Sequence, residues 1–455
     1  MRVNDTAAAE QTPLDRRRVL PIFILVFVDI LGLTVILPLL HLYAAAFGAG
    51  PLEIALAIAA FPLAQLVGLP VMGALSDRYG RKPLLLISQA TTCLSFIMLG
   101  LATSLELVIL SRLLDGLFGA NLSTAQAALS DITDETNRTR GLGIIGAAFG
   151  LGFIFGPIIA LISLELTNSL AMPAFTAAIY SFVSILVTSF LFKETRPPET
   201  RGTSQQLWLS PLMTLRYLLK PSLGMLLLLM FAQQIIFFGY ESLLGLFTLT
   251  RLGFLGRGNA VLFLVIGLIL VTVQLRFIGR WSARLGDGRL ATLALGLLAL
   301  GLLLTATTPE SPHPLYLREI VARDLLGAGQ SATEAMIGDF GIELPGNENR
   351  GFSGVLWLLV AVVPVSVGAG LIRPALNSLI TQSVAAHEYG RALGVSAALV
   401  SAANACAPLI AGLIFQGMGS SAPFAIGAVL MALLCLLSIV ALRPANARAN
   451  RAEKG

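Results

Sequence analysis

The chain has 455 residues, of which 56% are hydrophobic and only 12% are charged. Soluble domains carry about 25% charged residues, so this composition excludes an ordinary soluble fold. The net charge of +5 does not indicate nucleic-acid binding, because the basic residues are spread over many short segments instead of one domain. We expect an all-α membrane protein, since a backbone in lipid must satisfy its own hydrogen bonds.

Twelve apolar segments are long enough to cross a hydrocarbon core about 30 Å thick. They lie at 19–41, 53–73, 84–103, 106–130, 141–164 and 171–192, and then at 222–247, 259–279, 290–307, 353–376, 391–417 and 422–442. The first resembles a secretory signal peptide, because Arg16, Arg17 and Arg18 precede it. Its apolar stretch is longer than the apolar region of a secretory signal peptide, which is usually about 7–15 residues. We therefore expect the segment to remain as a span.

The basic residues predict the orientation. With the N-terminus inside, 24 of the 30 Lys and Arg residues fall in the inner segments or near the inner ends of spans, which is the positive-inside bias. We therefore expect a multi-pass protein with cytoplasmic N- and C-termini. Because neither an organelle signal nor a retention motif is recognised in the sequence, we expect the membrane to be the bacterial inner (plasma) membrane. Cys93, Cys406 and Cys435 all fall within spans and are expected to pack as small apolar residues; no metal site or cofactor is predicted.

The spans divide into two groups of six. The sequence predicts a cytoplasmic segment at 1–18, a six-helix bundle at 19–193, a cytoplasmic linker at 194–221, a second six-helix bundle at 222–442 and a cytoplasmic tail at 443–455. The linker begins with the Pro-rich ETRPPETRGTSQQ and continues with LWLSPLMTLRYLLK, a candidate amphipathic surface helix. The second bundle carries a periplasmic insertion at about 308–352, in which LYLREIVARDLL is a surface helix, a lid or a solvated excursion.

The two groups share a motif. GALSDRYGRKPL at 73–84 corresponds to GRWSARLGDGRL at 279–290, an offset of 206 residues. Internal repeats of six spans are typical of secondary transporters. The first copy resembles the signature of the major facilitator superfamily between its second and third helices, and the resemblance extends over the whole chain. It implies that Asp77, Arg81 and Asp131 form a charge cluster that latches the outward-facing state. Gly73, at the end of span 2, is expected to let a neighbouring helix approach closely. Arg78 and Lys82 are expected only to fix the topology.

Span 1 contains an acid at its centre. A carboxylate there costs about 2.5–3.5 kcal/mol on insertion scales and usually faces a cavity, and taking up a proton removes that charge. Asp29, Gly32 and Pro38 resemble the first helix of the drug–proton antiporters, which implies that Asp29 is the main proton site. The alternative is a structural Asp bonded to a neighbouring helix.

Span 4 contains a charged pair. Arg112 and Asp115 are three residues apart and share a helix face. Arg112 matches the basic residue that the family uses in proton transfer, so the resemblance implies that Arg112 and Asp115 couple the charge of the proton site to cavity access. Asn121 and Gln126 are expected to line the substrate cavity. The alternative is a salt bridge that only fixes packing.

Span 5 carries the glycine pattern of the family's antiporters. Gly143, Gly152, Gly156 and Pro157 match it, while the two glycines that end the pattern are replaced by Ala160 and Leu161. Glycines along one helix permit close, sliding contact, and a proline bends the helix. The resemblance therefore implies an exporter that works by antiport.

Span 7 contains further polar residues among aromatics. Gln233, Gln234, Tyr240 and Glu241 suit a cavity wall that binds an amphipathic molecule, although Glu241 could instead be solvated at the outer rim. The three histidines, His41, His313 and His387, are expected at the surface.

Together these features predict a secondary transporter, not an enzyme, that exports small amphipathic compounds or drugs in exchange for protons. Its expected partners are a small-molecule substrate, protons and membrane lipids, without nucleic acid, and we expect a monomer. The tetracycline exporters resemble spans 1 to 5 but carry an acid in span 3 where this chain has Ser95, which argues against tetracycline itself. Two alternatives are an importer or facilitator of a sugar or organic acid, and a non-transporting receptor or assembly factor.

Overall fold

The computed structural model describes residues 16–132, 138–167, 169–196, 216–327, 342–385 and 388–442. Throughout these ranges the regular secondary structure is helical. Apolar composition explains this, because a helix satisfies its backbone hydrogen bonds within one segment. Much of the predicted linker, including most of its candidate amphipathic helix, lies outside the described residues, as do His387 and the C-terminal tail.

Six spans form the N-terminal half. Their helices are α1 (Arg16–Ile36), α3 (Pro51–Tyr79), α4 (Arg81–Gly100), the pair α5 (Leu105–Phe118) and α6 (Asn121–Asp131), α7 (Arg138–Thr167) and α8 (Met172–Leu191), with the short α2 (Leu40–Ala45) between α1 and α3. Within this half α1 packs against α7, α3 against α5, and α4 against α8.

Six more spans form the C-terminal half. Their helices are α10 (Pro221–Leu252), the run α11 (Gly256–Thr272), π-helix η2 (Val273–Phe277) and α12 (Ile278–Leu285), then α13 (Asp287–Ala306), α15 (Ser353–Gln382), α16 (Tyr389–Met418) and α17 (Ala422–Ala441). Eleven helical runs among the described residues are individually long and apolar enough to cross a membrane. The broken pair α5–α6 supplies the remaining span, so the prediction of a twelve-span all-α membrane fold is confirmed.

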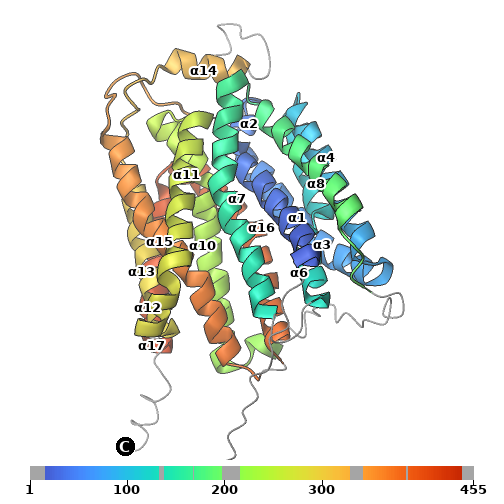
Figure 1. The fold of residues 1–455 in the computed structure, drawn as a ribbon. Coiled ribbons are helices and arrows are strands. Elements are labelled where there is room, and N and C mark those ends of the chain that lie inside the picture. The colour runs from blue at the N-terminus through green and yellow to red at the C-terminus, as the bar shows by residue number, and fades with distance from the viewer. Residues whose placement is uncertain are drawn as a thin grey trace, which may run out of the picture.

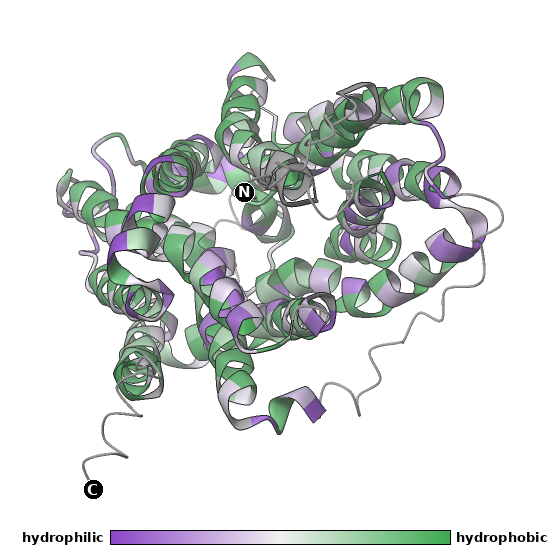
Figure 2. Ribbon diagram, turned by 60° about the horizontal axis from the view of Figure 1, so that its bottom comes forward, coloured by the Kyte–Doolittle hydropathy of each residue, from purple (hydrophilic) through white to green (hydrophobic). Residues whose placement is uncertain are grey.

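Both halves stand side by side with their helices upright (Figure 1). We call the end at which α1 begins and α17 ends the inner end, and the opposite end the outer end. Most of the helical ribbon in Figure 2, which looks toward the inner end, has the colour of hydrophobic residues, as expected for helices that cross lipid. The insertion between α13 and α15 lies at the outer end and contains α14 (Arg318–Gly327), so most of its LYLREIVARDLL segment is a helix.

Span 4 is broken where the sequence predicted one continuous helix. Gly119 adopts φ −72° and ψ 62°, which ends α5. Ser88 of α4 fills the break: its hydroxyl donates to the Phe118 carbonyl oxygen (2.6 Å) and accepts from the Ala120 N–H (3.0 Å). Backbone groups freed inside a membrane protein need such partners, so a side chain from a neighbouring helix makes the break tolerable.

The shared motif occupies a helix–helix corner and not the loop that the sequence predicted. α3 continues to Tyr79, and α4 starts at Arg81. Only Gly80 separates them, with φ +105°, a conformation that residues with a Cβ rarely adopt. The second half repeats this corner with Gly286 at φ +75° between α12 and α13, which supports the internal repeat.

Candidate functional site: the transport path between the halves

The predicted cluster of Asp77, Arg81 and Asp131 is assembled at the inner end of the N-terminal half. Arg81 NH1 lies 2.8 Å from Asp77 Oδ1, and Arg81 Nε donates to Asp131 Oδ2 at 3.0 Å. Arg81 also donates to Ser76 Oγ (2.9 Å). The structure therefore brings together helices α3, α4 and α6. Gly73 lies earlier in α3 than Asp77, about two turns before the end of the helix.

Three residues after span 6 complete this cluster, and sequence reasoning assigned them to the linker. Arg196 NH1 pairs with Asp77 Oδ1 (2.5 Å), and Thr195 Oγ1 donates to Asp131 Oδ2 (3.2 Å). The Glu194 carboxylate accepts from the backbone N–H groups of Arg81 (2.8 Å) and of the residue after it (3.1 Å). It thus caps the N-terminus of α4, where unpaired N–H groups favour an anion.

The position of these three residues could have been noticed. Glu194, Thr195 and Arg196 follow span 6 directly, on the same inner side as the motif. All partners described for the cluster belong to the N-terminal half, so here it holds one half together. Its role as a latch of the outward-facing state stays a prediction.

Among the described residues of the second half, no ion pair is found at the equivalent corner, where Ala283 stands in place of the motif acid. At this corner, between α12 and α13, the described partners of Asp287 are neutral donors: Ser282 Oγ (2.5 Å), Ser378 Oγ (2.6 Å) and Gln382 Nε2 (2.9 Å). The two inner corners therefore differ in charge, and the ionic network lies on the N-terminal side.

Asp29, the predicted proton site, lies at mid-length of α1 and is half-buried. Its Oδ1 accepts a hydrogen bond from Asn121 Nδ2 (2.8 Å) at the start of α6. Asn121 is buried, and its Oδ1 has no partner in the described structure. The sequence named both residues separately; the break in span 4 is what places Asn121 against α1.

Arg112 and Asp115 form the predicted pair, with NH1 and Oδ2 3.3 Å apart and both side chains buried. Arg112 NH2 also donates to Ser95 Oγ (2.8 Å), and the guanidinium lies over the Phe96 ring at 5.4 Å. Ser95 is the position where the tetracycline exporters carry an acid. In this chain Asp115 neutralises Arg112 from the same helix, and Ser95 supplies only a neutral acceptor.

The glycines of α7 form a close contact with α1. A side chain at Gly152 would collide with Ile30, and one at Gly156 would collide with Thr34. Thr34 Oγ1 donates to the Gly152 carbonyl oxygen at 2.9 Å, one of the backbone groups in the helix that contains Pro157. Gly143 lies in the same helix. The close packing that the glycine pattern predicts is present between these two helices.

The polar residues of α10 point in different directions. Gln234 Nε2 donates to Asn404 Oδ1 of α16 (2.8 Å), whereas Tyr240 packs edge-on against Phe424 of α17, with ring centroids 5.7 Å apart. Gln233 is buried and donates to the Met230 carbonyl oxygen. Glu241 is half-buried. Gln126 of α6, the remaining predicted cavity residue, is exposed.

The two halves meet at the outer end. His41 of α2 is only 2% exposed, so the expectation of a surface histidine was wrong. Its Nε2 lies 3.2 Å from Asn259 Nδ2 of α11, and Asn259 Oδ1 accepts from Thr248 Oγ1 of α10 (2.6 Å). The imidazole fits against Gly245, where a Cβ would collide with the ring. The chain turns after Ile36 and forms α2, which carries His41 under the other half.

Further contacts close this end. Gly256 of α11 fits against Leu164, Leu39 and Leu42, and α3 packs along α16, where Gly412 abuts Ala55. An exposed ion pair joins Arg257 Nε to Glu165 Oε1 (3.2 Å). This ion pair and the His41–Asn259 contact are polar links between the halves, and both lie at the outer end, so the structure is closed there.

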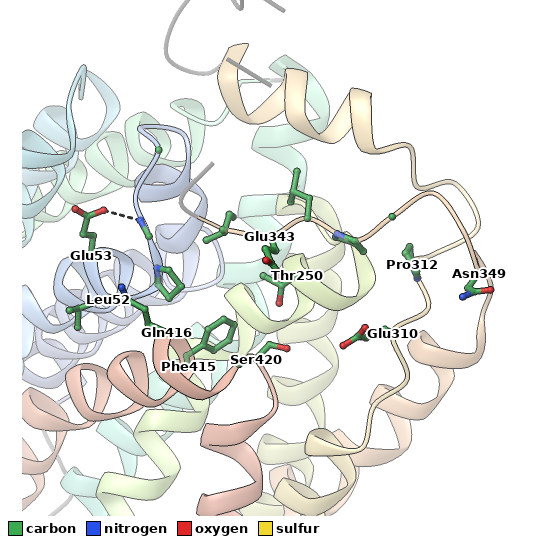
Figure 3. Close-up of a pocket in the computed structure, with 18 of the residues that line it drawn as sticks. Leu52, Glu53, Thr250, Glu310, Pro312, Glu343, Asn349, Phe415, Gln416 and Ser420 are labelled. Atoms are coloured by element: carbon green, nitrogen blue, oxygen red, sulfur yellow. Dashed lines mark hydrogen bonds between the residues drawn. The ribbon is translucent and has the colours of Figure 1, made fainter. Parts of the chain in front are cut away.

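The insertion is anchored to the C-terminal half and faces the other half across an outer cavity of about 1010 Å³. Arg251 at the end of α10 pairs with Glu310 (2.9 Å) and donates to the Thr308 carbonyl oxygen (2.6 Å). Figure 3 shows Leu52 and Glu53 of α3 on one side of this cavity and Glu310 and Asn349 of the insertion on the other. The described parts of the insertion, residues 308–327 and 342–352, therefore form part of the outer mouth.

Comparisons with known proteins agree with this architecture. The family model described as Major Facilitator Superfamily matches residues 22–356 and 351–455. The chain is 27% identical over 399 residues to the tetracycline resistance protein, class B, of Escherichia coli, covering 86% of this chain and 87% of that protein. It is 23% identical over 394 residues to multidrug resistance protein 2 of Bacillus subtilis (strain 168), covering 86% and 88%.

Solved structures show the same fold. The human organic anion transporter MFSD10 (TETRAN) superposes with a TM-score of 0.64 at 24% identity, covering 94% of this chain and 100% of that one. The nucleoside transporter NupG superposes with a TM-score of 0.65 at 13% identity, covering 94% and 99%. With twelve spans, a repeated inner corner and these relatives, the chain belongs to the Major Facilitator Superfamily and is a transporter similar to the tetracycline- and multidrug-resistance proteins of that family.

Proposed function

We propose that this protein exports small amphipathic compounds across the bacterial inner membrane in exchange for protons. The observation that carries the proposal is the environment of Asp29. Its carboxylate sits in the middle of a span, and the partner described for it is the neutral amide of Asn121. Within the described structure no Lys or Arg pairs with Asp29, so uptake of a proton is the way to remove a charge that lipid-embedded helices tolerate poorly.

The neighbouring charges support this assignment. Arg112 is already satisfied by Asp115 and Ser95, so its guanidinium is not free to neutralise Asp29. The pair on α5 and the acid on α1 lie in the same half, joined through the break that follows Gly119. A change of charge at Asp29 can therefore act on α6 through Asn121 without breaking the Arg112 pair.

Coupling requires that proton and substrate favour different conformations or exclude one another. The structure is closed at the outer end, which corresponds to one extreme of alternating access. In the proposed cycle, substrate enters from the inner side, the halves rock, and a proton that binds Asp29 from the outer side returns the carrier. The close contact of α1 with Gly152 and Gly156 lets the helix that bears Asp29 follow this motion as a rigid unit.

The proposal is tested in inside-out vesicles with an acidified lumen and a pH-sensitive dye. The vesicles are challenged with lipophilic cations, antibiotics, sugars and organic acids. We expect at least one amphipathic compound to release the proton gradient, Asp29→Asn to abolish the response, and Asp324→Asn, an exposed acid of α14, to leave it unchanged. Full pH-driven transport by Asp29→Asn would show that Asp29 is not the proton site. Uptake of a sugar or acid down its gradient, without proton movement, would favour a facilitator.

A further inference from the structure

We infer that Glu241 is a second proton-carrying carboxyl, contributed by the C-terminal half, so that the carrier exchanges protons at one acid in each half. This inference rests on the proposed function, because it adds a proton site to the same path. Nothing in the comparisons assigns a role to Glu241.

The depth of Glu241 places it inside the membrane. It lies 11 residues before the end of α10 at Leu252, about 16 Å from the outer end of that helix at 1.5 Å per residue. Ten apolar or small residues and a single basic residue, Arg251, follow it in α10. Glu241 is therefore too deep to be the solvated rim residue that the sequence left open.

Helix geometry gives its direction. At 100° per residue, Glu241 points within about 40° of Gly245. Gly245 touches the ring of His41 from the other half. The other faces of α10 pack against helices of its own half. Gly239 contacts Ala407 and Ala411 of α16, and Tyr240 contacts Phe424 of α17. Glu241 therefore lies on the face that α10 presents to the N-terminal half, one turn inside the closed outer contact.

Glu241 has no neutralising partner. Within the part of the chain that the structure describes, no hydrogen bond or ion pair involves its side chain. It is half-buried, like Asp29. A carboxyl with neither a cation nor a hydrogen-bond donor is most stable in its neutral form when water is excluded, and it is deprotonated when the path opens to water. That alternation is the property a carrier needs from a proton site.

The charges on the helices packed against α10 do not supply a permanent counter-ion. α2 brings His41, which contacts Asn259, and Tyr43, whose hydroxyl donates to the Leu170 carbonyl oxygen. The remaining titratable or charged residues of these helices are Glu53, Asp77, Arg78 and Tyr79 of α3, Asp287 and Arg289 of α13, Arg373 of α15, Tyr389, Arg391 and Cys406 of α16, and Cys435 of α17. Within the described structure none of them forms an ion pair or a hydrogen bond with Glu241. Of the groups on α10 itself, Tyr240 faces α17 and Arg251 pairs with Glu310.

The internal repeat relates Glu241 to Asp29. α1 and α10 are the first helices of their halves, and the motif offset of 206 residues puts Ile235 at the position of Asp29. Glu241 is six residues further along, about 9 Å nearer the outer end. The two carboxyls therefore stand on equivalent helices at different depths, one held by Asn121 and the other beneath the outer contact. A proton entering from the outer side meets Glu241 first.

The test reads the carboxyls directly and does not depend on finding a substrate. Wild-type protein in liposomes is titrated by infrared difference spectroscopy in D2O, which reports the C=O stretch of protonated carboxyls. We expect two embedded carboxyls to titrate, Glu241→Gln and Asp29→Asn each to remove one of them, and the double variant to remove both. Glu241→Asp should keep a titrating band, and the surface variant Asp324→Asn should leave both embedded bands unchanged.

A second measurement uses N,N′-dicyclohexylcarbodiimide, which modifies protonated carboxyls in apolar surroundings. We expect mass spectrometry of the wild type to find modification at Glu241 that declines at least tenfold as the pH is raised. If modification occurs at Asp29 alone and Glu241→Gln leaves the infrared titration intact, the inference is wrong while the proposed function survives. If Glu241→Gln abolishes binding of tetraphenylphosphonium but not the titration, Glu241 is a substrate-cation site and the inference is likewise wrong.

Discussion

Arg81 is the residue on which the inner cluster depends, and its removal gives the sharpest test of the structure. The guanidinium contacts Asp77 at 2.8 Å, Asp131 at 3.0 Å and Ser76 at 2.9 Å, and its side chain is only 7% exposed. Arg78, in the same motif, is exposed and lies over the Tyr79 ring at 5.4 Å. The variants Arg81→Ala and Arg78→Ala therefore each remove an arginine side chain, one from a buried ionic cluster and the other from an exposed position.

The contacts set the expected magnitude. Hydrogen bonds to charged groups contribute about 1.5–3 kcal/mol each, and Arg81 makes two to carboxylates. The loss is reduced because Asp77 keeps Arg196 and because the Asp131 side chain is 24% exposed and can be hydrated. We expect Arg81→Ala to destabilise the N-terminal half by about 2–4 kcal/mol. For Arg78→Ala we expect about 0.5–1 kcal/mol, the value of an exposed cation–π contact.

The assay is thermal unfolding of detergent-solubilised protein, followed by tryptophan fluorescence and by loss of monodisperse protein. If the N-terminal half melts as one unit, Arg81→Ala should lower the Tm by roughly 5–10 °C. Arg81→Lys should fall between the two Ala variants, because an ammonium cannot reproduce the forked contacts of a guanidinium. Equal Tm values for Arg81→Ala and Arg78→Ala would refute the claim that the buried ion pairs hold this end of the half together.

Three further outcomes are expected. Gly412→Leu should prevent closure of the outer end and raise labelling of the protein from the outer side several-fold. Gly417→Leu, in the same helix but with no atom near the added Cβ, should leave the labelling unchanged. Equal labelling of the two variants would contradict the outer contact. Ser88→Ala should destabilise the protein by about 1–3 kcal/mol because the break in span 4 loses a donor and an acceptor, and Ser123→Ala, which bonds only within its own helix turn, should cost less. Burial lowers the pKa of His313 in the insertion below its ordinary 6.5, so the released insertion binds the proton more strongly. Docking of the insertion on the C-terminal half should weaken as the pH falls through about 6.5. Proteolysis of the insertion, normalised to an unstructured substrate, should then accelerate. His313→Gln should remove this pH dependence.

Local chemistry determined much of what the sequence predicted. Spans, orientation and the repeat follow from runs of apolar residues and from the placement of Lys and Arg, which depend on transfer energies and not on long-range contacts. The Arg112–Asp115 pair was predictable because three residues separate the two on one helix. The cluster of Asp77, Arg81 and Asp131 was predictable only through the resemblance to a family, since 50 residues separate Arg81 from Asp131.

Other features depend on contacts between distant segments, and these the sequence did not reveal. Ser88 makes the break in span 4 possible, and that break in turn brings Asn121 to Asp29. Glu194 caps a helix that begins 113 residues earlier. Each is a polar side chain whose partner is a backbone group or an amide in another helix, and no periodicity in the sequence marks such a partner.

His41 shows the limit most clearly. It stands at the end of an apolar run, where we expected it at the surface. The tertiary structure buries it, because α2 turns under the other half and Gly245 leaves room for the ring. The sequence by itself determined a twelve-span transporter with an acid in span 1 and another in span 7. Only the packing of the two halves decided which polar groups meet, because in a membrane protein the spans follow from transfer to lipid, whereas pairing between them follows from where small residues let helices approach.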